Sequence, residues 1–159
     1  MTQRMPDDKF ITFFFGVLDP LERTISYCCA GHDPPLLLRL DGSTEHLDQG
    51  GLVLGIVDNA SYETGQVTIN RGDRLLLYTD GITETMDGEG EGSEFGVENL
   101  KRFLGRHSEL SSRDLLNTLL ITLRDYRGDE TPFDDMTLLL IGEISGRKHL
   151  IDSESNDSG

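Results

Sequence analysis

Two acidic positions in the sequence each lie where a short apolar run meets a turn. Asp80 follows residues 75–79, five apolar or β-favouring residues, and Gly81 comes directly after it. Asp134 and Asp135 open a second apolar run that extends to residue 141. A short apolar run bounded by turn signals is typical of a strand buried on both faces. A carboxylate at the end of such a strand is costly unless a cation meets it, so Asp80 either caps the following turn or holds a metal ion.

The spatial relation between the two runs decides between these interpretations. If both are strands that lie antiparallel and adjacent, the end of one lies beside the start of the other. Asp80 and Asp134 would then meet at one edge of a sheet. Hard carboxylate oxygens, with no suitable cluster of histidine or cysteine, favour Mg²⁺ or Mn²⁺ over zinc. Each acid is also a common turn residue, and this remains the alternative.

The acidic segment after Asp80 offers a different cation site. Five of its residues fall at positions one, three, five, six and twelve of an EF-hand-like loop: Asp87, Glu89, Glu91, Gly92 and Glu98. Glutamate is long for positions three and five, and no amphipathic helix precedes the loop. A flexible flap or a solvated insertion is therefore the preferred interpretation.

The composition bounds the class of protein. A chain of 159 residues suits one domain with a sizeable core. Its net charge of -15 argues against nucleic acid and anionic membrane as partners, and it fits a divalent cation or a basic surface. The adjacent Cys28 and Cys29 cannot easily pair, which is typical of a reducing, cytoplasmic compartment. Residues 10–18 form the longest apolar run, which is too short to span a bilayer.

The order of expected elements indicates the fold class. Strands are predicted over residues 10–18, 24–30, 36–40, 43–47, 62–69, 75–79 and 136–144. An Asp-Gly turn at residues 41–42 predicts a hairpin. Residues 10–18 are apolar on both faces, which predicts a strand in a sheet that is covered on each side. Residues 50–55 are predicted to be a glycine-rich loop close to other backbone. Two helices, over residues 97–104 and from Ser111 to Gly128, interrupt the last pair of strands. This order predicts an α+β fold with a largely antiparallel sheet.

Four motifs in this order resemble the SpoIIE-like branch of the PPM-type (protein phosphatase 2C-like) serine/threonine phosphatases. They are Ala30-Gly-His-Asp-Pro34, Tyr78-Thr-Asp-Gly-Ile-Thr-Glu84, Phe95-Gly96 and Asp134-Asp-Met-Thr137. The resemblance implies an α-β-β-α sandwich of mostly antiparallel sheets with a two-metal centre of Mn²⁺ or Mg²⁺. Asp80 and Asp134 match the metal aspartates of the family, whereas Asp135 and Thr137 match residues that support them or form turns. His32 is expected to be structural, because its motif is turn chemistry.

The sequence also departs from the family pattern. The upstream Gly-Asp stretch and the Gly-Asp-x-x-Gly-His-Gly type motif, which supply further metal ligands in the family, are absent from it. Residues 10–144 are therefore expected to be the C-terminal part of such a domain, with residues 1–9 loose and residues 145–159 a disordered tail. The expected truncation would leave an apolar sheet edge, which invites formation of a homodimer.

These observations give an expected function. The complete domain would hydrolyse phosphoserine or phosphothreonine in a phosphoprotein, and the family suggests an anti-sigma-factor antagonist as that substrate. Because two metals activate water directly, no covalent phosphoenzyme and no nucleophilic side chain are required. With half of the ligands missing, this chain is expected to be inactive or nearly inactive alone. The alternative is a binding module that keeps the fold without catalysis.

Overall fold

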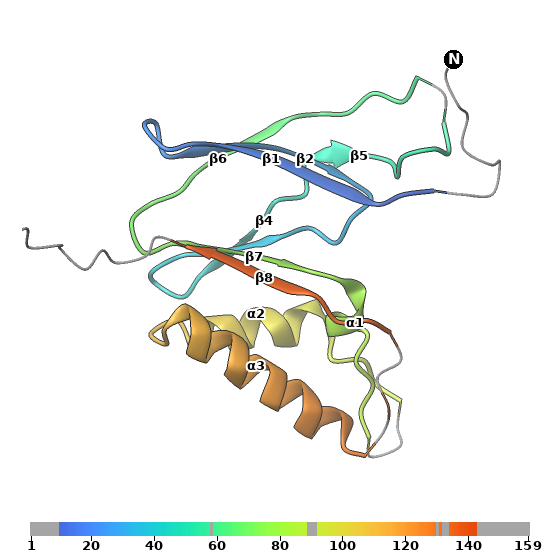
Figure 1. Ribbon diagram of the computed structural model, residues 1–159, viewed down its shortest axis with the longest axis vertical. Helices are drawn as coiled ribbons and strands as arrows, with labels where there is room; N and C mark the ends of the chain where they lie inside the picture. The colour runs from blue at the N-terminus through green and yellow to red at the C-terminus, as the bar shows by residue number, and fades with distance from the viewer. Residues whose placement is uncertain (1–9, 58, 89–91, 130, 132–133, 143–159) are drawn as a thin grey trace, which may run out of the picture.

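The computed structural model describes residues 10–142, except for residues 58, 89–91, 130 and 132–133, and shows two stacked sheets with helices on one side (Figure 1). The first sheet contains β1 (Phe13–Asp19), β2 (Thr24–Ala30), β5 (Gly50–Gly51) and β6 (Gly65–Thr68). The second contains β3 (Leu36–Leu38), β4 (Thr44–His46), β7 (Arg74–Tyr78) and β8 (Leu138–Gly142). The helices are α1 (Asp80–Thr83), α2 (Gly96–Arg106) and α3 (Ser112–Arg127). The predicted α+β sandwich is confirmed.

Most strand pairs in both sheets are antiparallel. In the first sheet β2 pairs with β1 and β6, and in the second sheet the order is β4-β3-β7-β8. The predicted Asp-Gly hairpin joins β3 to β4, with Gly42 at a φ of 85°. The loop predicted over residues 50–55 is wrong for its first two residues, because Gly50 and Gly51 form a short strand parallel to β2, while the predicted close approach to other backbone is confirmed. A Cβ on Gly50 would lie 1.8 Å from the carbonyl oxygen of Cys29, so only glycine allows this pairing.

The two central strands of the second sheet, β3 and β7, are covered on both faces. One face of β3 and β7 presents Leu36, Leu38, Leu76 and Tyr78 to the helices, and the other presents Leu37 and Leu75 to the first sheet. Successive strand residues point to opposite faces, so burial on both faces requires a continuous apolar run. This explains why residues 75–79 carry no alternating polar residues.

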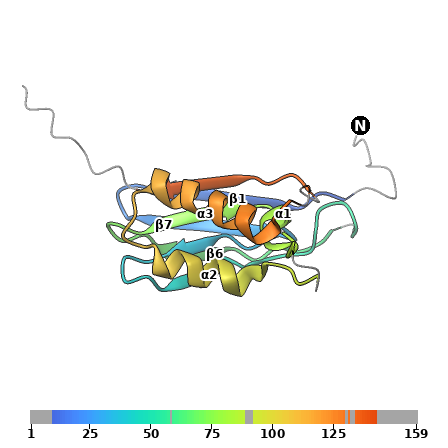
Figure 2. The same cartoon turned by 90° about the horizontal axis from the view of Figure 1, so that it is seen from below.

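The two long helices follow the predicted pattern. The Ser111 side chain caps α3 by accepting a hydrogen bond from the Asp114 N–H at 3.2 Å, and Gly128 ends the helix at a φ of 62°. Leu115, Leu119 and Leu123 recur every fourth residue and are fully buried. Figure 2 shows α2 and α3 side by side over the same sheet. The described residues therefore form three layers: helices, second sheet and first sheet.

The first apolar run does not have the predicted environment. Residues 10–18 were expected to be buried on both faces, yet β1 is exposed along most of its length, with Phe15 56% and Val17 54% exposed. In the described part of the chain β1 is an edge strand, and no helix lies over the outer face of its sheet. Phe14 packs inward, where its ring lies 5.8 Å from that of Tyr27.

Several predictions fall outside the described residues. These are the loose segment at residues 1–9, the tail at residues 145–159, and part of the acidic flap, including Glu89 and Glu91. Among the residues that the structure describes, no helix is long and apolar enough to cross a membrane.

Candidate metal centre

The strands β7 and β8 bring the two predicted metal residues to one edge of the second sheet. They pair antiparallel, with Tyr78 opposite Leu138, which is the arrangement that the metal hypothesis required. Beyond this pair, Thr79 and Thr137 extend the contact. The Thr79 N–H donates to the Thr137 carbonyl oxygen at 3.2 Å, and the Thr137 N–H donates to Thr79 Oγ1 at 3.0 Å. The segment that carries Asp134 is thus fixed beside the end of β7.

Gly81 allows the two acidic segments to touch. A Cβ at this position would lie 2.7 Å from the carbonyl oxygen of Asp135, which is closer than a side chain tolerates. The hydroxyl of Thr79 also donates to this oxygen, at 3.1 Å. The glycine after Asp80 is therefore required by the close approach of the Asp134–Asp135 backbone, independently of any role of the Asp80 carboxylate. Figure 1 shows α1 at the same end of the molecule as the start of β8.

Each aspartate uses one carboxylate oxygen locally. Asp80 Oδ1 accepts the Gly81 N–H at 2.9 Å, and Asp134 Oδ1 accepts the Asp135 N–H at 2.7 Å. Both side chains are exposed, and neither forms an ion pair with a described lysine, arginine or histidine. The turn role predicted as an alternative for Asp80 is thus present, and it leaves the other oxygen of each residue available. The metal role of Asp80 and Asp134 stays a prediction.

Further acids lie near this edge, and the sequence reasoning did not single them out. Burial, followed by the negative charge of Asp80, raises the pKa of Asp33, while His32 lowers it. Desolvation is the largest cause that raises the pKa of Glu84, and the charge of Asp80 is the next. The charges of Glu94, Asp33 and Asp134 raise it further. Asp33 lies within the Ala30–Pro34 motif, so its sequence position was the available signal. Negative charges that raise the pKa of neighbouring carboxyls, here Asp33 and Glu84, form a site that a cation would stabilise.

The neighbouring histidine and tyrosine are held in structural roles. The His32 Nδ1–H donates to the Asp33 carbonyl oxygen at 2.8 Å, and Cys29 Sγ donates to the His32 carbonyl oxygen at 3.0 Å. Burial, with the charges of Asp33 and Cys29, raises the pKa of Tyr78 to about 12, so Tyr78 stays neutral. The contacts of His32 agree with the structural role predicted for it.

The donor set fits a hard divalent cation in part. Carboxylate oxygens without a cationic partner are the ligands that Mg²⁺ and Mn²⁺ prefer. Among the described residues, however, no three side chains of histidine, cysteine, aspartate or glutamate are arranged to hold a metal ion. Asp80 and Asp134 would thus supply part of a coordination sphere. The EF-hand alternative lacks its first helix, because α1 has four residues, and Glu98 pairs with Lys101 at 2.7 Å.

Comparison with known proteins agrees with this architecture. The family model described as Stage II sporulation protein E (SpoIIE) matches residues 1–142. Protein IcfG of Synechocystis sp. is 29% identical over 83% of this chain, and phosphoserine phosphatase RsbU of Bacillus subtilis is 26% identical over 87%. The structure of the SiaA-PP2C domain of Pseudomonas aeruginosa matches with a TM-score of 0.73 and 22% identity, over 85% of this chain and 52% of that one.

The sandwich has the fold of PP2C-type phosphatase domains. Within that class, the chain belongs to the SpoIIE family. It spans 20% of the length of IcfG and 41% of the length of RsbU.

Proposed function

We propose that this chain supplies the Asp80 and Asp134 part of a divalent-cation site in a protein serine/threonine phosphatase domain. The observation that carries the proposal is the convergence of two acidic segments, 54 residues apart, at one sheet edge where no described cation neutralises them. The similarity to RsbU, which is named a phosphoserine phosphatase, supports the class of reaction. Mn²⁺ or Mg²⁺ are the proposed ions because all candidate ligands are hard oxygens.

The residues of the chain have distinct parts in this reaction. Asp80 and Asp134 would hold the cation through the carboxylate oxygens that make no local hydrogen bond. Thr79 and Gly81 fix the separation of the two acidic segments, so the ligands are positioned before any ion binds. A bound divalent cation would lower the pKa of water and offset the charge of the phosphate. Without it, Asp33, Asp80 and Glu84 would repel a phosphoserine dianion.

The activity of the chain alone follows from its ligand number. Two carboxylates are fewer than a two-metal centre needs, so we propose that the isolated chain binds Mn²⁺ weakly and is inactive or nearly inactive. The proposed substrate of the complete domain is a phosphoprotein in the cytoplasm, and an anti-sigma-factor antagonist is the specific candidate. The free thiols Cys28 and Cys29 support a reducing compartment.

Mn²⁺ binding tests the proposed site directly. Electron paramagnetic resonance of free Mn²⁺ is expected to show binding by the wild-type chain that is lost in Asp80→Asn and in Asp134→Asn. Glu109→Gln makes the same charge change in the connection between α2 and α3, and it should leave binding unchanged. Equal binding by all four proteins would refute the site. Measurable hydrolysis of a phosphoserine peptide with Mn²⁺, abolished by Asp80→Asn, would refute the proposed inactivity.

A second candidate is a binding module without catalysis. It is favoured by the absence of a three-residue metal cluster among the described side chains. The two candidates differ in the Mn²⁺ experiment, because a pure binding module has no reason to bind the ion through Asp80.

The exposed apolar β1 supports the separate proposal that the chain forms a homodimer.

A further inference from the structure

The outer surface of the helical layer differs in charge from the rest of the protein. Residues 96–128 carry six lysines and arginines against four aspartates and glutamates, although the chain as a whole has a net charge of -15. Two of these acids are already paired, since Glu98 lies 2.7 Å from Lys101 and Asp125 lies 3.4 Å from Arg124. Figure 2 shows both long helices on the same side of the sheet. The layer is therefore a locally cationic surface on an acidic protein.

A groove of about 320 Å³ lies between α2 and α3 on this surface. Arg102 and Arg106 line it from α2, and His107 follows them at the end of the helix. Both arginines are exposed, and neither pairs with a carboxylate of the described residues. Arg102 donates one hydrogen bond to Asn99 Oδ1, and a guanidinium has five N–H groups. The groove thus presents two guanidinium groups whose charge no described carboxylate pairs with.

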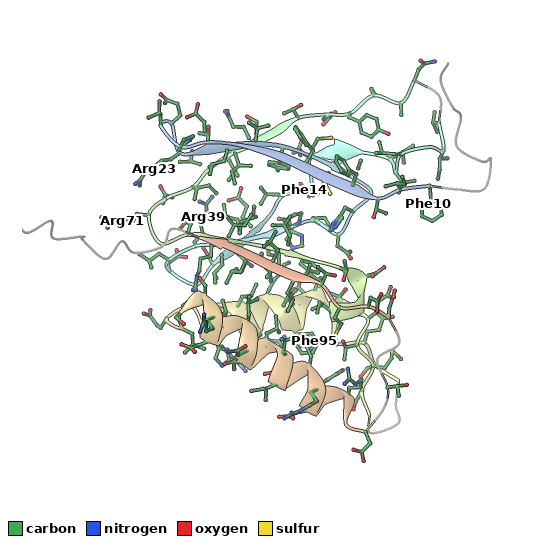
Figure 3. All side chains as sticks on the ribbon, in the orientation of Figure 1. Phe10, Phe14, Arg23, Arg39, Arg71 and Phe95 are labelled. Carbon is green, nitrogen blue, oxygen red and sulfur yellow. The ribbon has the colours of Figure 1, made fainter. Side chains whose placement is uncertain are left out.

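The walls of the groove are aromatic and fixed in place. The ring of His107 stacks on Phe103 at 4.3 Å, and its Nδ1–H donates to the Phe103 carbonyl oxygen at 2.9 Å. On the opposite wall, Tyr126 packs edge-on against Phe95 at 5.4 Å, and its hydroxyl donates to the Ser93 carbonyl oxygen at 3.2 Å. Figure 3 places Phe95 beside the helices, on the side of the sheet that they cover. A groove with walls fixed in this way binds with little loss of conformational freedom.

We propose that this groove docks an extended acidic segment of a partner protein, with carboxylates at alternate positions beside an apolar residue. Arg102 and Arg106 lie one turn apart, about 6 Å along the helix axis. Alternate residues of an extended peptide are separated by about 6.6 Å and point to one side, so two such carboxylates match the two arginines. The aromatic walls accept the apolar residue. The docking goes beyond the proposed phosphatase function, because it requires neither a phosphate nor a metal ion.

The charge distribution favours a protein segment over nucleic acid. A polyphosphate backbone would meet the field of the whole chain, with its net charge of -15. A short acidic peptide covers only the groove and therefore meets less of this field. Salt should weaken such binding, since the contacts are between exposed charges.

Fluorescence anisotropy of a labelled peptide tests the docking. The probe has glutamates at alternate positions around one phenylalanine, and its matched control has glutamines in their place; both are measured with the full chain in EDTA. Wild-type protein should bind the acidic peptide and not the glutamine peptide. Arg106→Glu should weaken binding at least about tenfold, while Arg106→Lys should retain most of it. Arg113→Glu, an equal charge change on α3 outside the groove, should have little effect.

Chemical shifts of Phe103, His107 and Tyr126 give a second measurement, and urea unfolding checks that each variant is folded. Shift changes confined to these residues would support the docking. The proposal is overturned if wild-type protein does not bind, or if Arg113→Glu weakens binding as much as Arg106→Glu. Stronger competition by single-stranded DNA would also overturn it. So would self-association that Arg106→Glu abolishes, because the groove would then hold a second copy of the chain.

Discussion

The strands β7 and β1 are both apolar along most of their length, but β7 is mostly buried and β1 is mostly exposed. Each contains a run of apolar residues without alternating polar positions. Leu76 of β7 is fully buried and Leu75 is 4% exposed, whereas Phe15 and Val17 of β1 are more than half exposed. The difference lies in what surrounds the strands. β7 has a strand on each side, a helical layer on one face and a second sheet on the other, and β1 has one neighbouring strand and one covered face.

This comparison shows what an apolar run determines. The run gives a strand the capacity to be buried on both faces, because it places no polar group where burial would leave it unpaired. Whether burial occurs depends on segments elsewhere in the chain. The two outer surfaces of the molecule therefore differ. The helices that cover the second sheet carry the groove between α2 and α3, and the first sheet leaves the apolar outer face of β1 exposed.

Removing a side chain from the covered region should have the largest effect on stability. Leu119→Ala deletes a fully buried side chain of α3 and is expected to lower the free energy of unfolding by about 3 kcal/mol, through lost burial and a residual cavity. Phe15→Ala in β1 removes a larger side chain and should change it by no more than about 0.5 kcal/mol, because Phe15 is exposed. Urea unfolding measures both. Equal losses would show that β1 is buried in solution.

The link between the two sheets should have the next largest effect. Arg39 lies between them (Figure 3), where it donates to the Thr68 carbonyl oxygen of one sheet at 2.8 Å and to Asp73 Oδ2 at 2.7 Å. Asp73 is 2% exposed. Arg39→Met should lower the free energy of unfolding by about 2 kcal/mol, since Asp73 loses its charged partner and keeps two backbone N–H donors, from Leu40 and Asn70.

A double-mutant cycle supplies the control for this link. Adding Asp73→Asn to Arg39→Met should be less destabilising than the sum of the two single changes, because the buried charge that loses its partner is no longer present. Strict additivity in urea unfolding would mean that Arg39 stabilises the protein independently of Asp73.

The acidic edge should show a smaller effect that depends on pH. Burial and the charge of Asp80 raise the pKa of Asp33, so the folded state holds this proton more tightly than the unfolded chain. The carboxyl supports folding below its ordinary pKa of about 3.9, and this support is lost as pH rises through the raised value. Asp33→Asn has no such loss. The free energy of unfolding of Asp33→Asn, relative to wild type, should therefore rise between pH about 4 and about 7. The rise should be less than about 1 kcal/mol, because Asp33 is partly exposed.

Asp41 provides a control of opposite sign. Hydrogen bonds from the Ser43 side chain and N–H lower the pKa of Asp41, so its contribution is present at neutral pH and is lost as pH falls. Asp41→Asn should therefore lose stability relative to wild type as pH rises. Urea unfolding in EDTA measures Asp33→Asn between pH about 4 and about 7, and Asp41→Asn below and across the ordinary pKa of about 3.9. Trends of the same sign would contradict the assignment.

The smallest change in stability is expected on β1, where self-association should respond instead. Phe15→Lys places a charge on an exposed edge strand and should alter the free energy of unfolding by no more than about 0.5 kcal/mol. It should reduce any self-association of the chain, because a lysine on an edge disfavours pairing with another strand. Sedimentation velocity at several concentrations measures this. Unchanged association in Phe15→Lys would exclude β1 as the contact.

Local sequence signals predicted most of the elements. The Asp-Gly turn, the Ser111 cap and the Gly128 terminus were readable because each depends on a few neighbouring residues. The pairing of the runs at residues 75–79 and 136–144 was a hypothesis that rested on the two acids, and β7 and β8 do pair in this way. The short strand at Gly50 was missed because two glycines carry no strand signal of their own and pair only through contact with Cys29.

The sequence by itself determined the types of side chain that the protein has available: acids that are candidate ligands, the apolar residues of a core, and an acidic net charge. Only the tertiary structure decided the neighbours. It placed Asp33 and Glu84 beside the predicted acids and fitted Gly81 against Asp135. It also grouped Arg102 and Arg106 with Tyr126 of α3, and left one face of β1 exposed. The physical reason is that side-chain type is local, whereas burial and electrostatic environment depend on segments that folding brings together.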